Sequence, residues 1–518
     1  MKPRGTKTRF LVAAVLLIAG NIGGWYGFQN YLGWRDWTDT RHDLEALGES
    51  LDAASFIPPP IPDAENLALA PYFQRLYQYR IDPQTGTLTF KTPNTEASAE
   101  VSMLPFGAAG VGPKRPDLPT WTSAHPLDLP LLREYYRQRP DFPHVSGQEV
   151  APAVEVLRAL NRFDDTFNEV ARAAAERPRT RFPINWNERP VWQLALPEGL
   201  FVQSFNSALR LRACAFLAVG QPDAALKDIL LGLRFCRALE DEPILLSVLV
   251  NAASVNLVLQ PVWEGLAIRG WNDAQLQELQ GQLQAFDLLR ACQRASRCER
   301  TTFTLSMREE LRKPGGVAKV LAVSQLVPPD GPPKPGLQLL GRLAPGGWAD
   351  KAVAYACRWE QRYFIDAIDA AERRVSPARL KENTEERARL RMLPSTFLVK
   401  SGWDLMPTLT RNVARAQAGL DQAAVACALE RYYLTRQSYP AHLDELVPAY
   451  LDRVPTDMID GQPLHYEPTP DSRYRLWNVG WDERDDHATI VWRSSGRPDD
   501  GEGDWVWQYT AVSPPVKP

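Results

Sequence analysis

The sequence has no excess of positive charge. Lys and Arg together number 59 against 62 Asp and Glu, which gives a formal net charge of −3 at pH 7. A protein that binds nucleic acid through its phosphates needs a basic surface, and this overall balance supplies no such field. We therefore expect no nucleic-acid partner.

Cysteine is sparse and has no metal-binding or redox spacing. The 518 residues include six cysteines and no C-x-x-C pair, which argues against a zinc ribbon and a thioredoxin-like site. All six lie in apolar, helix-like stretches, so we interpret them mainly as buried small hydrophobic residues. A disulfide between Cys214 and Cys236 is the alternative, if their helices form a hairpin.

The common catalytic motifs are missing too. The sequence contains no H-E-x-x-H, G-x-S-x-G, Walker A or G-x-G-x-x-G pattern, and its six histidines are scattered. His487, beside Asp485 and Asp486, could serve as a metal ligand or an acid-base group, but we favour a surface histidine with acidic neighbours. We expect no catalytic activity.

The N-terminus has a strong membrane signal. An apolar stretch of about 19 residues, Phe10 to Phe28, follows four basic residues and as a helix would span roughly 28 Å, close to the thickness of the bilayer core. The basic flank, residues 1–9, predicts a cytoplasmic N-terminus and an extracytoplasmic body. A cleaved signal peptide with Phe10 to Ala19 as its apolar region is the competing interpretation. An aromatic belt is expected to follow the span, formed by Trp25, Tyr26, Tyr31, Trp34 and Trp37.

The chain is too long for one hydrophobic core, so several regions are expected. Residues 38–149 are rich in proline and predict irregular structure, with a short strand pair around Gly86 and a short helix at Leu131 to Arg137. Residues 150–325 predict a helical domain. A linker rich in Pro and Gly is expected at 326–347 and a helical segment at 348–406, continuous from Trp348 to about Arg374.

Within the helical domain the apolar spacing defines individual helices. Leu160, Phe163, Phe167 and Val170 form one stripe of a helix. A helical hairpin is predicted from Leu200 to Leu239, with its turn at Gly220 to Asp223. Its middle part, Ala213 to Lys227, is similar to a single tetratricopeptide-type hairpin, but no repeating period accompanies it. A long apolar helix should follow the hairpin and extend to Ile268. Asn272 then has the spacing of a capping box at the start of the next helix.

The C-terminal region predicts a helix and then a small antiparallel sheet. From about Pro407 to Leu434 the apolar residues recur at spacings of 3 and 4, which indicates an amphipathic helix that packs one face. Strands are predicted at Tyr474 to Val479 and at Ala488 to Trp492. The fold class is therefore mainly α, with a transmembrane helix at one end and an α+β module, residues 407–518, at the other.

A series of short motifs in this module agrees in order and spacing with a known family. The motifs are Leu429-Glu430-Arg431-Tyr432, Ser438-Tyr439-Pro440, Leu446-Val447-Pro448, Tyr450-Leu451, Val454-Pro455-x-Asp457, Asp460-Gly461-x-Pro463 and Tyr466. Residues 407–492 thereby resemble the globular domain of the major pseudopilins of type II secretion. In pseudopilins a prepilin-peptidase site precedes a membrane helix, and that helix continues directly into this domain. Here Gly5 is followed by Thr6 to Arg9, which do not match the peptidase site. The resemblance therefore implies a borrowed domain rather than a processed pilus subunit, in a large anchored bacterial protein.

The resemblance also implies a calcium site. Asp482, Asp485 and Asp486 stand where that family has its acidic calcium-binding loop, and calcium prefers six to eight oxygen ligands. A solvated acidic loop without metal is the alternative. These three aspartates are our candidate metal ligands, with calcium as the candidate cofactor.

Two functions remain open at this point. The first is a single-pass anchored structural or interaction protein of the bacterial inner membrane, with its body in the periplasm, unidentified protein partners and a role in envelope or secretion-related assembly. The second is an extracytoplasmic hydrolase or carbohydrate-binding protein that uses the C-terminal Asp and Trp residues. In the first function the tryptophans are core residues of the sheet, which we favour, and in the second they stack on sugar rings. These tryptophans are Trp477, Trp481, Trp492, Trp505 and Trp507.

Overall fold

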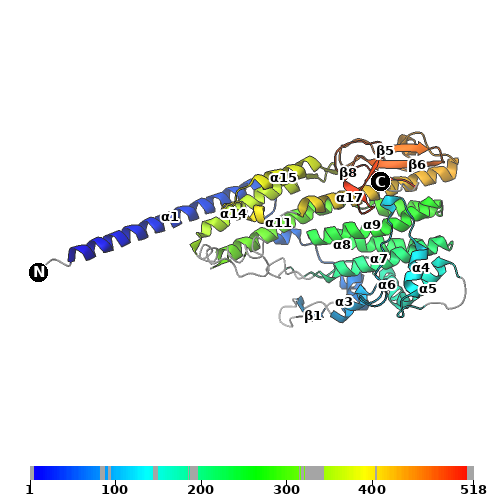
Figure 1. Cartoon of the computed structure of the whole chain (residues 1–518), viewed down its shortest axis with the longest axis horizontal. Helices are drawn as coiled ribbons and strands as arrows, with labels where there is room; N and C mark the ends of the chain where they lie inside the picture. The colour runs from blue at the N-terminus through cyan, green and yellow to red at the C-terminus, as the bar shows by residue number, and fades with distance from the viewer. Residues whose placement is uncertain are drawn as a thin grey trace.

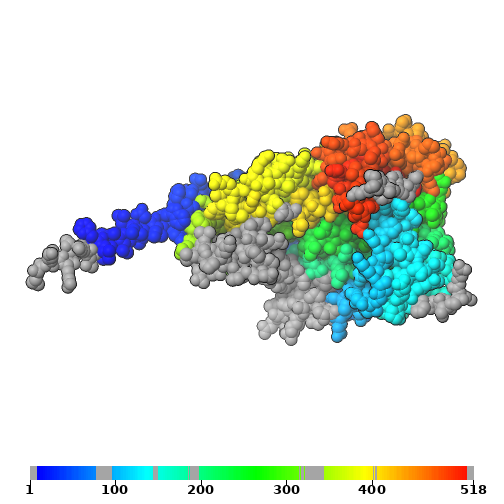
Figure 2. Space-filling view, in the orientation of Figure 1, coloured from blue at the N-terminus to red at the C-terminus, as the bar shows by residue number. Residues whose placement is uncertain are grey.

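A computed structural model shows an elongated, mainly helical protein. It describes residues 5–76, 78–81, 88–91, 95–143, 150–184, 186, 196–313, 315–316, 320, 343–402 and 405–509. Helix α1 (Gly5–Ala46) projects from one end of a body in which most long helices run along the same axis (Figure 1). The space-filling view shows the first part of this helix clear of the body (Figure 2).

Helix α1 is longer than the sequence predicted. The irregular region was expected from residue 38, but the helix continues to Ala46 because its second half packs on the body, mainly on α14 (Gly346–Glu360). Trp37 and Leu44 are buried in the main core. Trp37 is therefore a core residue, and its assignment to the aromatic belt was wrong.

The Pro-rich region forms short elements, several of which contribute to an aromatic core. They are η1 (Ala53–Phe56), η2 (Asp63–Glu65), η3 (Leu67–Leu69), α2 (Pro71–Gln74), β1 (Gln78–Ile81), β2 (Leu88–Lys91), α3 (Thr95–Ser102), η4 (Trp121–Ser123) and α4 (Leu129–Arg137). The antiparallel pair β1 and β2 confirms the predicted strands, while Gly86 lies outside the described residues. The core includes Phe73, whose ring lies 4.7 Å from that of Phe201.

The predicted apolar stripe is buried, but its helix is interrupted. Residues 150–176 form α5 (Pro152–Leu160), η5 (Asn161–Phe163) and α6 (Asp164–Glu176). Leu160, Phe163, Phe167 and Val170 all lie in the core.

The predicted hairpin is confirmed. It consists of α7 (Pro197–Ala218) and α8 (Pro222–Glu240), and Gly220 adopts a φ of 75° at the turn. Glycine fits this left-handed conformation because it has no Cβ. Helix α9 (Leu245–Ala267) packs on both helices, and Asn272 caps α10 (Asp273–Gln284) with Gln275 in the predicted capping box. The tetratricopeptide similarity stays a prediction.

The segment after the linker differs from its prediction. Most of 326–347 lies outside the described residues, but Gly346 and Gly347 already belong to α14. The helix predicted to about Arg374 ends earlier, at a π-turn, η7 (Gln361–Ile365), because the chain turns into a short hairpin, β3 (Ile368–Asp369) and β4 (Arg374–Val375). Helices α11 (Leu288–Arg312), α15 (Pro377–Arg389) and α16 (Phe397–Ser401) pack with α14 and η7.

Helix α17 (Met406–Arg436) is the central helix of the body. Residues 413–420 and 422–430 are all buried, since α9, α10, α11 and the C-terminal strands surround them. The expectation that this helix buries one face is therefore wrong. Small residues such as Ala416 and Gly419 allow this burial: a Cβ on Gly419 would lie 2.9 Å from the ring of Trp121. The domain boundary at 407 stays a prediction, and one hydrophobic core crosses it.

The C-terminal strands form two small antiparallel sheets on α17. The order in the first is β5 (His465–Thr469), β6 (Arg473–Asn478) and β9 (Trp505–Trp507), and the second pairs β7 (Ile490–Trp492) with β8 (Pro498–Gly503). A 3₁₀ turn, η8 (Leu443–Leu446), precedes them. The strands predicted in β6 and β7 are confirmed.

All six cysteines are buried, as their apolar contexts predicted, and all are free. The helices of Cys214 and Cys236 do form a hairpin, yet the two thiols are not bonded to each other. The Cys236 sulfur instead accepts a hydrogen bond from Asn206 Nδ2 at 3.3 Å.

Candidate functional site

The first candidate site is the exposed half of α1. Most of its apolar side chains are largely exposed: Phe10 is 76% exposed, Leu17 69% and Phe28 57%. The described residues contain a second helix that is long and apolar enough to span a membrane, α9, but two thirds of its apolar window is buried. Helix α9 is a core helix, while α1 has the composition of a membrane anchor or a signal sequence.

Helix α1 crosses α14 with the two backbones in contact. A Cβ on Gly33 would lie 2.1 Å from the carbonyl oxygen of Gly347, and a Cβ on Gly347 would lie 2.2 Å from that of Gln29. Only glycine allows this approach. The Asn30 side chain accepts a hydrogen bond of 2.8 Å from the Gly347 amide, which satisfies a free N–H group at the start of α14.

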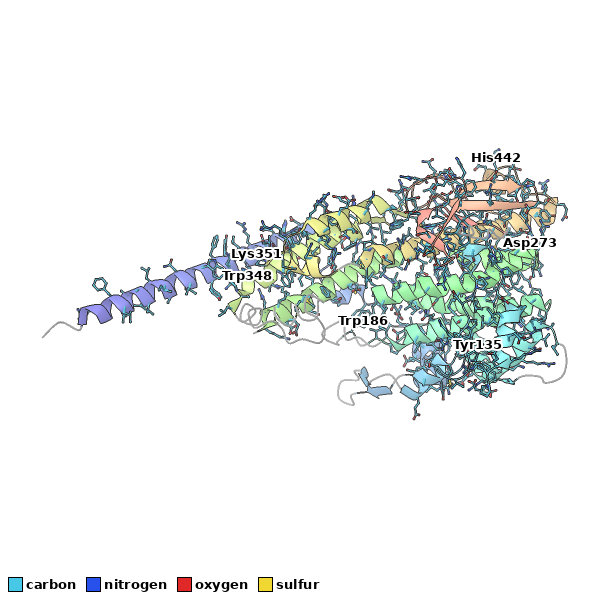
Figure 3. All side chains as sticks on the ribbon, in the orientation of Figure 1. Tyr135, Trp186, Asp273, Trp348, Lys351 and His442 are labelled. Atoms are coloured by element: carbon cyan, nitrogen blue, oxygen red, sulfur yellow. The ribbon has the colours of Figure 1, made fainter. Side chains whose placement is uncertain are left out.

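Side chains on both sides of this crossing extend the contact. Lys351 donates to Gln29 Oε1 at 3.0 Å, and the Trp348 ring meets Trp25 edge-on at 6.1 Å. Trp348 and Lys351 mark the place where α1 meets the body (Figure 3). One turn further along, the Arg308 guanidinium lies 4.9 Å from the Trp37 ring centre. The docked half of α1 is thus held by backbone, polar and aromatic contacts together.

The second candidate site is the acidic loop after β6. Each predicted calcium ligand has its own role there. Asp482 Oδ2 accepts a hydrogen bond from the Gly503 amide at 3.1 Å, and Asp485 Oδ1 accepts from Trp477 Nε1 at 3.0 Å. The carbonyl oxygen of Asp486 accepts from Thr489 Oγ1 at 2.5 Å. The structure places the three aspartates in one loop, where the carboxylates of Asp482 and Asp485 have different partners and Asp486 bonds through its backbone.

Asp504, which the sequence did not single out as a site residue, organises this loop. Its carboxylate oxygens accept hydrogen bonds of 3.2 Å from the amides of Asp486 and Thr489. Burial raises the pKa of Asp504 to about 6, although the backbone amides lower it in part. No sequence signal separates this aspartate from its neighbours, because its role depends on the pairing of distant strands.

A second group of side chains meets beside this loop. The ligand atoms of Asp457, Asp460 and His465 all lie within 4.8 Å of one another. Burial raises the pKa of the Asp457 carboxyl, against hydrogen bonds from the amides of Ile459 and Val479, both at 2.8 Å. In the sequence these aspartates stand out only as parts of the family motifs, and His465 is one of six scattered histidines. The spacing Asp457-x-x-Asp460-x₄-His465 was the available signal.

The tryptophans of this region are largely internal. Trp505 is 1% exposed, Trp507 0% and Trp477 7%. Buried rings cannot stack on a sugar, so these three have the core role that we favoured. Trp481 and Trp492 are partly exposed.

Comparison with known proteins adds no relative. No family model, no curated protein and no solved structure matches the chain.

Proposed function

We propose that the protein is a single-pass membrane-anchored structural or interaction protein. In this proposal its N-terminus lies in the cytoplasm of a bacterium, α1 crosses the inner membrane, and the body lies in the periplasm. The body ends in a pseudopilin-like module and takes part in envelope or secretion-related assembly through protein partners. No catalytic step is proposed.

The observation that carries the proposal is the continuity of α1. One unbroken helix includes the exposed apolar half and the half that packs on α14. A bilayer would cover apolar side chains such as Leu16, 67% exposed, that the protein leaves uncovered. The same helix would then hold the body in a fixed orientation at the membrane surface.

The docked half of α1 argues against cleavage within that half. A signal peptide is removed as a separable segment. Here any cut between Phe28 and Ala46 would fall where α1 is packed on the body, and Trp37 and Leu44 would lose their connection to the span. The basic residues Lys2, Arg4, Lys7 and Arg9 support a cytoplasmic N-terminus.

The pseudopilin-like module is supported by the order of its motifs and by the placement of α17. A long helix followed by a loop and small antiparallel sheets is the arrangement that the resemblance implies, and α17 with β5, β6 and β9 has this order. The rigid core between α1 and the sheets would keep this module at a fixed height above the membrane. Such a spacer suits a protein that presents a surface to partners.

The topology can be tested by expressing the full chain with β-lactamase fused to its C-terminus. We expect ampicillin resistance, full-length protein in the membrane pellet and no release by an alkaline carbonate wash. A chain that starts at residue 29 lacks the exposed apolar half of α1 but keeps the half that packs on the body, so it is the control and should give a soluble, inactive reporter in the cytoplasm. Release of a shortened protein into the periplasm would contradict the anchor, and an inactive full-length fusion would contradict the orientation.

A further inference from the structure

We propose that Asp457, Asp460 and His465 form a binding site for a divalent transition-metal ion, with Zn²⁺ as the best match. This site is separate from the calcium ligands considered above, and it does not rest on the proposed function.

The backbone of this segment is held in a tight, well-supported turn. The Asp457 amide donates to the Gln462 carbonyl at 2.7 Å, and the Gly461 amide donates back to the Asp457 carbonyl at 2.9 Å. Gly461 has a φ of 78°, which closes the turn. Strand β4 also holds this turn, because the Val375 amide donates a hydrogen bond of 2.9 Å to the Met458 carbonyl. A fixed backbone matters here because a metal site needs ligands held in place.

The ligand atoms lie around one common point. His465 Nε2 lies 4.0 Å from Asp460 Oδ2, which is too far for a hydrogen bond, and this buried nitrogen has no hydrogen-bond partner among the residues that the structure describes. Two ligands on one tetrahedral zinc ion, each at about 2.0–2.1 Å, lie roughly 3.4 Å apart. A shift of well under 1 Å would therefore let both bind one ion.

Asp457 can serve as the third ligand without giving up its backbone contacts. Its oxygens accept the amides of Ile459 and Val479 and the Asn478 side chain, and an ionised carboxylate has about four acceptor positions, which leaves one for a metal. Arg374, whose guanidinium lies beside Gly461, donates to the Ile459 carbonyl at 3.1 Å, so this contact does not occupy the carboxylates. Asp460 and His465 are 30% and 24% exposed, which gives an ion a path of entry.

The surroundings of His465 match those of a metal-bound imidazole. Its second nitrogen, Nδ1, faces Asp485 Oδ2 at 3.7 Å on the side away from the cluster. Asp485 is in turn held by Trp477 Nε1, and the Trp477 ring stacks on the imidazole at 5.2 Å and an angle of 18°. The separation between Nδ1 and Asp485 Oδ2 is longer than a hydrogen bond, and a shift of under about 1 Å would let Nδ1 donate to the carboxylate and leave Nε2 for the metal. This gives Asp485, one of the predicted calcium ligands, a positioning role.

The types of ligand atom in the cluster determine which metal ion it prefers. One imidazole and two carboxylates suit Zn²⁺, whereas Ca²⁺ and Mg²⁺ prefer oxygen ligands only. Three protein ligands leave a fourth position for water.

The experiment measures metal binding to the full chain in detergent after treatment with chelator. We expect one Zn²⁺ per chain by calorimetry and elemental analysis, with a raised unfolding temperature and no competition from excess Mg²⁺. His465→Gln and Asp460→Asn should each weaken zinc binding by more than 100-fold, and Asp485→Asn by about 10- to 100-fold.

His487→Gln is the matched control. His487 is 88% exposed and also lies 3.7 Å from Asp485, so it shares the environment but not the cluster. Its variant should bind zinc like the unmodified chain. Unfolding temperatures measured with chelator show whether each variant is folded. Absence of stoichiometric zinc binding, zinc binding that survives His465→Gln in a folded variant, or equal loss in His487→Gln would overturn the proposal.

Discussion

The carboxylate of Glu49 contacts the guanidinium of Arg300 at 2.8 Å, and the two side chains are 5% and 0% exposed. Glu49 follows the end of α1, while Arg300 lies in the middle of α11, which packs on α14 and α17. Arg297 adds a second contact to Glu49 at 3.0 Å. This buried ion pair therefore fastens the end of the anchor helix to the centre of the body.

Removal of Glu49 should destabilise the protein strongly. Glu49→Ala leaves the Arg300 charge buried without its carboxylate partner, and such changes cost about 3–5 kcal/mol. Glu45→Ala is the control, because its pair with Arg41 is more than half exposed on both sides and such pairs contribute about 0–1 kcal/mol. Denaturant unfolding of the detergent-solubilised chain measures both. Equal midpoints for the two variants would contradict the role of Glu49.

The crossing of α1 and α14 should not tolerate a side chain. Gly33→Ala places a methyl group against the Gly347 backbone, and overpacking of this kind costs about 1–3 kcal/mol. We expect faster trypsin cleavage after Arg35 or Arg41 as α1 loosens from the body. Gly27→Ala is the matched control: a Cβ there meets nothing within 4 Å, so cleavage should not increase. Unchanged proteolysis of Gly33→Ala would show that the backbones do not approach this closely.

Glu299 in α11 makes stability depend on pH. Burial raises its pKa from 4.5 to about 7, against a hydrogen bond from the Leu245 amide. Between these values the folded chain binds more protons than the unfolded chain, so this group lowers stability as pH rises from about 4.5 to 7. Below this window the effect is absent, and above it the effect is complete.

Glu299→Gln should therefore stabilise the protein above pH 7. Glutamine stays neutral and can still accept the Leu245 amide, and one pKa unit corresponds to about 1.4 kcal/mol, so a gain of up to about 3 kcal/mol is expected at pH 8. The gain should vanish near pH 4. Glu278→Gln, an exposed position on α10, should show no such pH dependence. A pH-independent gain for Glu299→Gln would contradict the buried carboxylate.

The calcium prediction has its own measurement. If Asp482, Asp485 and Asp486 hold calcium, the ion raises the unfolding temperature relative to chelator, because a ligand that binds only the folded state stabilises it. Asp482→Asn should abolish the calcium shift and can keep an acceptor oxygen for the Gly503 amide. His465→Gln should leave the calcium shift intact while it removes the zinc shift. No calcium shift in the unmodified chain would leave these aspartates as a hydrogen-bonded loop.

Much of the fold could be predicted because its signals are local. The Gly220 turn, the Asn272 capping box and the short helix α4 each depend on residues a few positions apart. The same holds for the apolar spacing of α17. Predictions were wrong where contacts with distant residues decide whether a side chain is buried. From its sequence position Trp37 was predicted to lie at the membrane interface, but α14 and α11 cover it.

The candidate sites divide in the same way. The three acidic residues 482, 485 and 486 were visible as a dense acidic loop, but their hydrogen bonds depend on where Trp477 and Gly503 lie after the strands pair. Spacing was the only sequence signal for the cluster of Asp457, Asp460 and His465, and spacing does not show whether three side chains meet. Only the turn at Gly461 and its support by β4 bring the three ligand atoms together.

The sequence by itself determined the apolar N-terminal segment, the helical character of the chain, the turn between α7 and α8 and the start of α10. These follow from composition and from interactions between residues up to four positions apart. Tertiary structure alone decided that α1 continues into the core, that α17 is buried on all sides and that His465 meets two aspartates. Each of these depends on the packing of elements tens to hundreds of residues apart, and local preference does not specify such packing.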